Sequence, residues 1–183
     1  MTDELLTVVV RKREQHTPGV ITLELVDPQG QPLPGFDAGA HIDLHLGDDL
    51  IRQYSLCNDP ADVSAYRVGV LKDPASRGGS VAVHERLFEG TELQISAPRN
   101  LFPLAQTDGR SILIGGGIGI TPMIAMAYAL HAANKPFELW YCGRSRSSCA
   151  FIDDLTSSAF AEQVHCHFDD EHDGVGVNLE AVF

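Results

Sequence analysis

The stretch from Ser111 to Pro122 limits the possible folds of this chain most strongly, because it joins an apolar strand to a helix through a run of glycines. Ser111 to Ile114 is followed by Gly115-Gly116-Gly117-Ile118-Gly119-Ile120-Thr121-Pro122. Thr is a good N-cap and Pro suits the first helical position, so we expect Thr121 to cap a helix beginning at Pro122. Glycines at such a turn let a ligand's phosphates approach the backbone. The stretch predicts the start of a βαβ unit with a nucleotide-binding turn.

The residues after this turn continue the same pattern. A helix is expected from Met123 to Ala133 and a strand from Phe137 to Cys142, followed by a further helix and strand. Strands that alternate with helices form a parallel sheet with helices on its faces. We therefore predict an α/β domain with a nucleotide-binding turn over residues 105–183.

The first half of the chain predicts an antiparallel β domain. Short apolar alternations are separated by Gly, Pro and Asp residues, which is typical of strands joined by turns. The six expected strands are Leu5 to Arg13, Val20 to Val26, His41 to Leu46, Ile51 to Cys57, Tyr66 to Leu71 and Glu92 to Ser96. This spacing fits an antiparallel barrel or sandwich over residues 1–104.

One of these strands carries side chains suited to a ligand. In an extended strand Arg52 and Tyr54 point to one face, and Gln53 and Ser55 point to the other. The Arg can bind a phosphate with its planar fork, the Tyr ring offers a flat surface, and Ser55 adds polar contacts. The alternative is an ordinary sheet surface with a hairpin partner.

A short helix is expected inside the β domain. Ser76-Arg77-Gly78-Gly79-Ser80 precedes a run from Val81 to Phe88 with helical spacing, and Ser80 is a good N-cap. The free backbone N–H groups of its first turn would lie at the positive end of the helix dipole. This arrangement predicts a phosphate site, and the alternative is a connecting helix with a flexible entry.

Composition limits the partners and the compartment. The chain has 183 residues, of which 44% are hydrophobic and 21% charged, and 13 basic against 25 acidic residues give a net charge of −12. Such a charge argues against nucleic acid or an anionic membrane as a partner. Residues 1–6 lack a signal pattern and no apolar run approaches a membrane span, so we expect a cytoplasmic protein. The four cysteines form no CxxC pair, so we expect reduced thiols and no iron-sulfur cluster.

A cluster of metal-binding residue types lies near the end of the chain. His165, Cys166 and His167 precede an acidic loop of Asp169, Asp170 and Glu171, and His with carboxylates suits zinc or nickel. A strand on which the two His side chains alternate with Cys166, followed by a solvated acidic loop, explains the same run. We expect the strand and no metal.

Five motifs occur in a fixed order along the chain. They are Arg52-x-Tyr54-Ser55-Leu56, Arg77-Gly78-Gly79-Ser80, Pro98-Arg99-Asn100-x-Phe102, Gly115 to Pro122 and Tyr141-Cys142-Gly143-Arg144. In this order the chain resembles ferredoxin-NADP reductase-like flavoproteins, and more narrowly the group of phthalate dioxygenase and vanillate demethylase reductases. In that group a flavin barrel, a nicotinamide-nucleotide domain and a plant-type [2Fe-2S] domain pass electrons to an oxygenase. The resemblance therefore implies an antiparallel β barrel of the Greek-key type over residues 1–104.

The resemblance assigns roles to individual residues. Arg52 would bind the flavin phosphate with Gly79 and Ser80, Tyr54 would pack on the flavin, and Ser55 would act at the flavin N5 edge as the catalytic residue. The full cofactor-binding set that it implies is Arg52, Gln53, Tyr54, Ser55, Val70, Leu71, Lys72, Arg77, Gly78, Gly79, Ser80, Gly116, Gly117, Thr121 and Arg144. Within this set, Gly116, Gly117 and Arg144 would meet the nicotinamide nucleotide.

The resemblance also implies cofactors, a reaction and partners. The flavin would be FMN, with FAD possible, and NADH or NADPH would be the substrate that delivers hydride to flavin N5. The chain would be the electron-transfer reductase component of an aromatic oxygenase or demethylase system. Its electron acceptor would be the oxygenase or a separate iron-sulfur protein.

The end of the chain departs from the family pattern. The family continues into a strand ending in Cys-Gly-Pro and a [2Fe-2S] domain with CxxxxCxxC spacing, whereas this sequence ends at Phe183. We therefore expect an incomplete parallel sheet over residues 105–183, in a naturally short or truncated form without [2Fe-2S] in this chain. The alternative function is a flavin-binding module without turnover.

Overall fold

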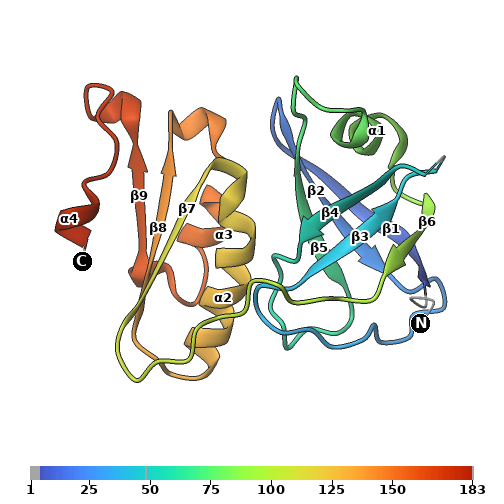
Figure 1. Ribbon diagram of the computed structural model, residues 1–183, viewed down its shortest axis with the longest axis horizontal. Helices are drawn as coiled ribbons and strands as arrows, with labels where there is room; N and C mark the ends of the chain where they lie inside the picture. Colours follow the sequence, from blue (N-terminus) through green and yellow to red (C-terminus); the bar gives the residue numbers. More distant parts are fainter. Residues whose placement is uncertain (1–4, 48, 183) are drawn as a thin grey trace.

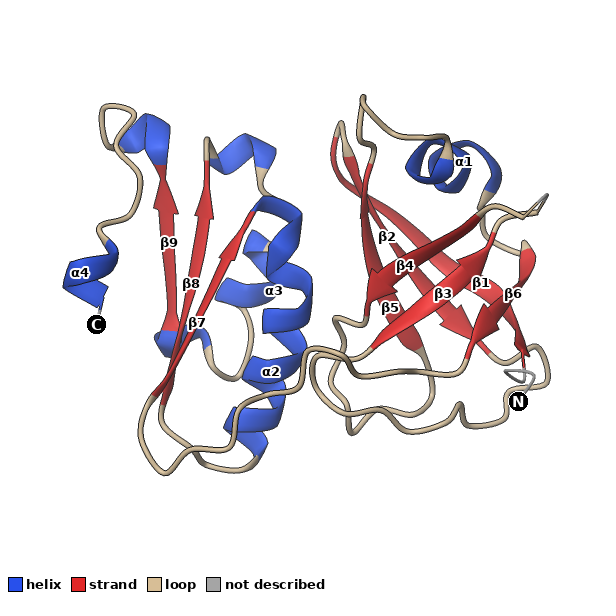
Figure 2. Cartoon of the chain, viewed as in Figure 1, coloured by secondary structure: helices blue, strands red, loops and turns tan. Residues whose placement is uncertain are grey.

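The computed structural model describes residues 5–47 and 49–182, which form two sheets (Figures 1 and 2). Strands β1 to β6 make one sheet and strands β7 to β9 make the other. Residues 1–4 of the predicted first domain, together with residues 48 and 183, lie outside the described residues.

The first sheet is antiparallel and curls towards a barrel. Its strands are β1 (Leu5–Thr17), β2 (Val20–Val26), β3 (His41–His45), β4 (Ile51–Ser55), β5 (Tyr66–Leu71) and β6 (Glu92–Ser96). They pair in the order β4-β3-β6-β1-β2-β5. The edge strands meet only through an isolated bridge between Leu56 and Val68, so the barrel is not closed by a full ladder. The predicted antiparallel β fold is confirmed.

The first strand is longer than its sequence pattern indicates. Apolar alternation ends near Arg13, but β1 continues to Thr17, which pairs with Val20 of β2. The register shifts between Val10 and Lys12 and again near Thr17. Such irregularities let polar residues extend the hairpin without continuing the inward apolar face.

The short helix α1 (Gly79–Arg86) begins two residues earlier than predicted, and Ser80 is not its N-cap. Gly78 occupies that position with φ of 92°, a left-handed conformation that glycine adopts at little cost. The Ser80 hydroxyl instead accepts a hydrogen bond from the Asp73 backbone N–H at 3.1 Å. The residue preference misplaces the cap because a backbone N–H of the preceding loop competes for the Ser80 hydroxyl.

The second sheet is parallel, as predicted. Its strands are β7 (Ser111–Gly116), β8 (Phe137–Gly143) and β9 (Val164–Phe168), paired in that order. The helices are α2 (Thr121–Ala132), α3 (Ile152–Thr156) and α4 (Leu179–Val182), and the 3-10 turns are Gly117–Ile120, Arg146–Ser148, Ala161–Gln163 and Asp169–Glu171. Helices α2 and α3 lie between this sheet and the barrel-like sheet (Figure 2).

The glycine-rich turn forms a 3-10 helix before α2 begins, so Thr121 is not an N-cap. Thr121 already has helical backbone angles, with φ of −54° and ψ of −49°, and Ile120 precedes it as the cap residue. Its hydroxyl donates to the Ile118 carbonyl at 3.0 Å. Pro122 is therefore the second helical residue, a position that its missing N–H also tolerates.

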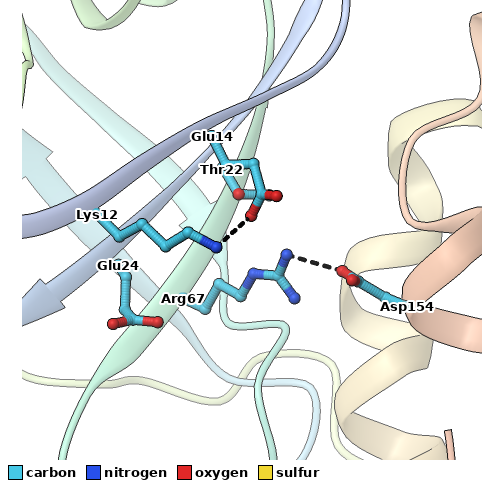
Figure 3. A pocket seen from close by; sticks show the side chains of 6 residues that line it. All are labelled: Lys12, Glu14, Thr22, Glu24, Arg67 and Asp154. Carbon is cyan, nitrogen blue, oxygen red and sulfur yellow. Dashed lines mark hydrogen bonds and ion pairs between the residues drawn. The ribbon is translucent and has the colours of Figure 1, made fainter. Parts of the chain in front are cut away.

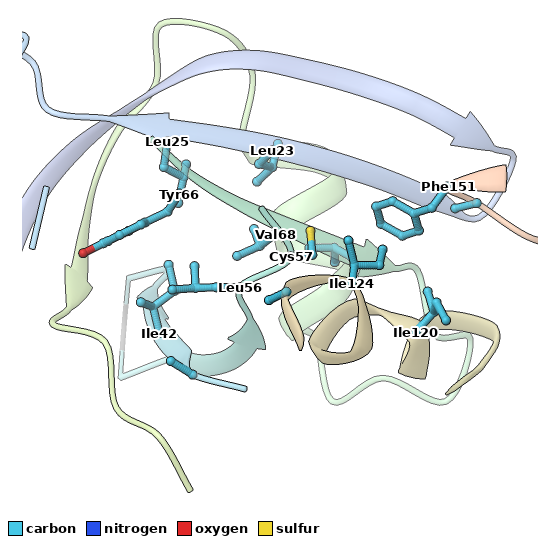
Figure 4. Close-up of a cluster of buried hydrophobic side chains, with 14 of the residues drawn as sticks. Leu23, Leu25, Ile42, Leu56, Cys57, Tyr66, Val68, Ile120, Ile124 and Phe151 are labelled. Atoms are coloured by element: carbon cyan, nitrogen blue, oxygen red, sulfur yellow. The ribbon is translucent and has the colours of Figure 1, made fainter. Parts of the chain in front are cut away.

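A single apolar core runs through both sheets. Leu56, Cys57 and Val68 of the barrel belong to the same buried cluster as Ile124 and Phe151 of the α/β half (Figure 4). Each of these side chains is at most 5% exposed. The two halves are therefore joined by packing as well as by the chain. Within the part of the chain that the structure describes, no helix has the length and apolar character needed to span a membrane.

Candidate functional site

A cavity of about 270 Å³ opens between strand β4 and the loop before helix α1. Its lining residues are Arg52, Gln53, Tyr54, Asp73, Ala75, Ser76, Arg77 and Ser80. Five of them, from two segments separated in sequence, belong to the predicted cofactor-binding set. Asp73, Ala75 and Ser76 lie outside that set, because an Asp-Pro-Ala-Ser loop has the composition of an ordinary turn.

Arg52 is held in this cavity by close packing and by backbone carbonyls. Its guanidinium donates to the carbonyls of Ile51 at 2.8 Å and Arg77 at 3.2 Å. A Cβ added at Gly79 would lie only 2.4 Å from the Cγ and Nε atoms of Arg52. The missing side chain at Gly79 is thus what allows the Arg52 side chain to lie against the first turn of α1.

The loop before α1 is tied down by its own polar groups. The Ser80 backbone N–H donates to the Ser76 hydroxyl at 3.3 Å, and the Asp73 carboxylate accepts from the Ala75 N–H at 2.9 Å. The cavity lining carries two guanidinium side chains, Arg52 and Arg77, against the single Asp73 carboxylate. Together with the positive end of the α1 dipole, these residues fit a phosphate-sized anion.

Tyr54 supplies an aromatic surface beside this charged region. It lies on β4 opposite Ile42 of β3 and is half-buried. Burial raises the pKa of its hydroxyl, with an opposing effect from Arg52, so the ring stays neutral at physiological pH. Ser55, the next residue, pairs with His41 and remains partly exposed. A planar ring system could stack on Tyr54 while its edge faces the Ser55 segment.

Three members of the predicted cofactor-binding set, Val70, Leu71 and Lys72, lie at and just after the end of β5 and outside the cavity lining. Val70 is buried, Leu71 is 41% exposed, and the Lys72 ammonium pairs with Glu85 of α1 at 3.2 Å. The Val70 carbonyl accepts a hydrogen bond from His84 Nε2 at 3.0 Å. His84 is buried, and burial lowers its pKa. Its hydrogen bond to the Val70 carbonyl links α1 to β5.

The glycine-rich turn has tight steric requirements of its own. A Cβ at Gly115 would lie 2.6 Å from the Ile120 Cα, and Gly117 has a φ of 52°. Gly116, Gly117 and Thr121 lie at the carboxyl end of β7, and Arg144 lies exposed after the end of β8. Ligands of open α/β sheets bind at this edge. None of these last four residues lines the Arg52 cavity.

The barrel and the glycine-rich turn nevertheless touch. The bridge between Leu56 and Val68 brings the end of β4 next to β5. A Cβ at Gly69 of β5 would meet the Thr121 Cγ2 at 2.9 Å. The segment containing Ser55 and the start of α2 therefore flank the same short piece of β5.

A second, charged cavity of about 240 Å³ lies between the two halves (Figure 3). It is lined by Lys12, Glu14, Thr22, Glu24, Arg67 and Asp154. The Arg67 guanidinium pairs with the Asp154 carboxylate at 2.7 Å and so links β5 to α3. No local pattern indicates this pair, because its members lie far apart in the chain.

The histidine-rich strand and the cysteines form no other centre among the described residues. The His165 ring stacks on Trp140 at 4.6 Å and the His167 ring on His172 at 4.3 Å. Across residues 5–47 and 49–182, no group of three or more His, Cys, Asp or Glu side chains could hold a metal ion. Burial raises the pKa of the Cys57 thiol to about 12, which keeps it protonated.

Comparisons with known proteins show that the chain is similar to a group of reductases. No family model matches the sequence. The chain is 50% identical over 167 residues to a vanillate O-demethylase oxidoreductase of Pseudomonas putida, covering 91% of this chain and 52% of the relative. It is 39% identical over 168 residues to phthalate dioxygenase reductase of Burkholderia cepacia, with the same two coverages of 91% and 52%. The chain thus spans about half the length of these curated relatives.

Solved structures show the same fold. A phthalate dioxygenase reductase, described as a modular structure for electron transfer from pyridine nucleotides to [2Fe-2S], superposes with a TM-score of 0.92 and 37% identity, over 99% of this chain and 57% of that one. A ferredoxin-NADP⁺ reductase from Plasmodium falciparum shares the fold alone, with a TM-score of 0.71, 16% identity, and coverage of 90% of this chain and 74% of that one. Over nearly its whole length, the chain is therefore homologous to the vanillate demethylase and phthalate dioxygenase reductases and has the ferredoxin-NADP reductase-like fold.

Proposed function

We propose that this chain is the flavin- and nucleotide-binding part of an NAD(P)H-dependent reductase component of an oxygenase or demethylase system. The observation that carries the proposal is the cavity in which Arg52, Tyr54 and Arg77 converge from separate segments. Two relatives are named a vanillate O-demethylase oxidoreductase and a phthalate dioxygenase reductase, which supports the reductase role. In this proposal residues 1–104 bind the flavin and residues 105–183 bind the nicotinamide nucleotide.

We propose FMN as the flavin. Arg52 and Arg77 supply two positive charges for a terminal phosphate, and the backbone at Gly79 and Ser80 lies at the positive end of α1. The cavity of about 270 Å³ has room for a phosphate and part of its polyol chain. Tyr54 offers its ring to the isoalloxazine, and the strand end at Val70 to Lys72 offers backbone groups to the pyrimidine edge.

The chain's residues orient and shield the reactants. When bound, the flavin supplies an electrophilic N5 atom that accepts hydride from a reduced nicotinamide. Ser55 would face that edge, and its hydroxyl would hold the ring by a hydrogen bond. Thr121 and the apolar contact around Gly69 would keep water from the space between the two rings. No general acid or base is required, so positioning supplies the rate enhancement.

The nucleotide would bind at the carboxyl edge of the parallel sheet. Gly116 and Gly117 would let its phosphates approach the backbone, and Arg144 would contact a ribose or phosphate. Either NADH or NADPH satisfies these contacts. Electrons would then pass to an oxygenase partner or to a separate iron-sulfur protein.

An absorption spectrum taken before and after anaerobic NADH addition tests the proposal. We expect the bands of an oxidised flavin, bleaching on NADH addition, and a released chromophore with the mass of FMN. A released chromophore with the mass of FAD would show that the bound flavin is FAD instead of FMN. Flavin that neither NADH nor NADPH reduces would instead identify a flavin-binding module without turnover. A colourless protein that takes up neither FMN nor FAD would contradict the proposal.

The role of Arg52 is tested separately by Arg52→Ala. Loss of a charge-assisted contact to the phosphate should weaken FMN binding about tenfold to a hundredfold, as measured by flavin fluorescence titration. Arg86→Ala is a matched control, because Arg86 lies at the other end of α1 and outside the cavity lining. Equal FMN affinities in the two variants would show that Arg52 does not contribute to flavin binding.

A further inference from the structure

Gly69 marks a point where the two halves of the molecule come unusually close. It lies in the middle of β5, and a glycine in a strand interior weakens the strand unless something approaches it. A Cβ at this position would meet Phe151 Cζ at 2.7 Å, Thr121 Cγ2 at 2.9 Å and Ile118 Cδ1 at 3.3 Å. All three neighbours belong to the α/β half. The glycine is therefore explained by the contact between the two halves.

Phe151 is fixed on its side of the contact. It precedes α3 with a φ of 66°, a strained conformation for a residue with a side chain, and it is 2% exposed. Its ring stacks on His16 of β1 at 5.2 Å, and the Arg67 guanidinium lies 5.6 Å from the ring centre. Such strain persists where the surrounding structure over-determines the conformation.

The residues on both sides of this contact adjoin the proposed binding sites. Val70 follows Gly69 on the strand proposed to contact the flavin. Ile118 and Thr121 belong to the glycine-rich turn proposed to meet the nicotinamide. The strand β5 and the glycine-rich turn therefore touch directly at Gly69, between the two proposed sites.

The ion pair between Arg67 and Asp154 is less suited to setting this distance. Its side chains are 24% and 41% exposed, so solvent screens the attraction and the two charges tolerate small movements. Packed atoms at van der Waals contact do not tolerate such movements. Protein interiors are close-packed, so adding one methyl group forces the neighbouring atoms to shift.

We propose that Gly69 and Phe151 form a spacing contact that fixes the distance between the flavin strand and the nicotinamide turn. Both are positioning residues and touch neither ring. This inference rests on the proposed function. Hydride transfer requires the reacting atoms at near contact, and a displacement of about 1 Å can lower its rate about a hundredfold.

The test is Gly69→Ala in the full chain, alone and combined with Phe151→Leu. The added methyl group should leave FMN affinity within about twofold, while flavin reduction at saturating NADH slows about tenfold to a hundredfold. Leucine has no atom at the Cζ position, so the double variant should recover part of the lost rate. Gly19→Ala is the matched control, because its Cβ would meet only Leu71 Cδ1 at an ordinary 3.6 Å.

A second readout uses the flavin-free protein. Amide hydrogen exchange at residues 118–121 and 152–156 should accelerate in Gly69→Ala and return towards normal in the double variant. Exchange in the core of β1 and β6 should stay unchanged, because the substitution loosens the contact and not the barrel.

The outcomes separate the spacing contact from the proposed function. Normal flavin reduction by Gly69→Ala, or a loss of flavin affinity that Phe151→Leu does not restore, would overturn the spacing contact. If the unsubstituted chain binds no flavin, the proposed function fails. The spacing contact is then tested by amide hydrogen exchange alone. Unchanged exchange in Gly69→Ala would then overturn the contact, and accelerated exchange reversed by Phe151→Leu would support it.

Discussion

At the scale of single residues, the absence of a side chain at Gly79 keeps Arg52 in the cavity. Gly79→Ala would place a Cβ 2.4 Å from the middle of the Arg52 side chain and so push the guanidinium away. We expect FMN affinity to fall about tenfold, measured by fluorescence titration. Gly35→Ala is the control, since a Cβ at Gly35 would meet no atom within 4 Å beyond its chain neighbours. An FMN affinity equal to that of the control would show that Arg52 keeps its contact by another route.

His84 predicts how stability changes with pH. Burial lowers its pKa below the ordinary value of 6.5, so the unfolded chain binds this proton more readily than the folded one. The stabilising effect of the neutral ring is therefore complete above about pH 6.5 and is lost as pH falls through the lowered folded pKa. His16 shifts in the same direction, also through burial.

The measurement is the melting temperature at about pH 7.5 and about pH 5.5, for the natural chain and for His84→Gln. Glutamine keeps an N–H donor for the Val70 carbonyl but does not titrate. The variant should lose less of its melting temperature between the two pH values than the natural chain does. An identical loss in both proteins would assign the acid sensitivity to other groups.

At the scale of elements, the glycine-rich turn depends on Gly115 for its shape. A Cβ there would lie 2.6 Å from the backbone of Ile120, so the 3-10 turn could not fold back on β7. We expect Gly115→Ala to lower the free energy of unfolding by about 1–3 kcal/mol in urea titration. Gly116→Ala is the matched control, because its backbone is extended and its Cβ would meet open space. Equal losses in the two variants would contradict the steric explanation.

Element boundaries also show where local sequence signals were insufficient. Ser80 and Thr121 are favourable capping residues, yet Gly78 and Ile120 occupy the cap positions. Each hydroxyl has another partner, the Asp73 N–H in one case and the Ile118 carbonyl in the other. The existence of both helices followed from apolar spacing, but their first residues depended on the backbone conformation of the preceding loops, which residue preferences alone do not fix.

At the scale of the whole molecule, packing rather than charge holds the two halves together. Phe151→Ala would empty a buried site in the shared core and should lower the free energy of unfolding by about 3–5 kcal/mol. Asp154→Ala removes a partly exposed ion pair and should lower it by about 1 kcal/mol or less. Urea titration of both variants checks the ranking. A larger loss in Asp154→Ala would show that the ion pair dominates the contact.

The strands of both sheets could be predicted because each one carries its own apolar alternation or run. The alternation from Val20 to Val26 and from Tyr66 to Leu71 defined inward faces, and both segments are strands in the structure. The order of these strands was not predictable from such patterns. In the first sheet β5 pairs with β2, and β6 lies between β3 and β1. These pairings join segments that are distant in sequence.

Local spacing and residue chemistry were enough to establish the fold class, the position of the glycine-rich turn and most of the residues that converge on the Arg52 cavity. Three contacts could not be foreseen in this way: Gly69 against Phe151, His84 with the Val70 carbonyl, and Arg67 with Asp154. Each of them joins elements that are separate in sequence. Their energies depend on distances that exist only after the elements concerned have packed against one another.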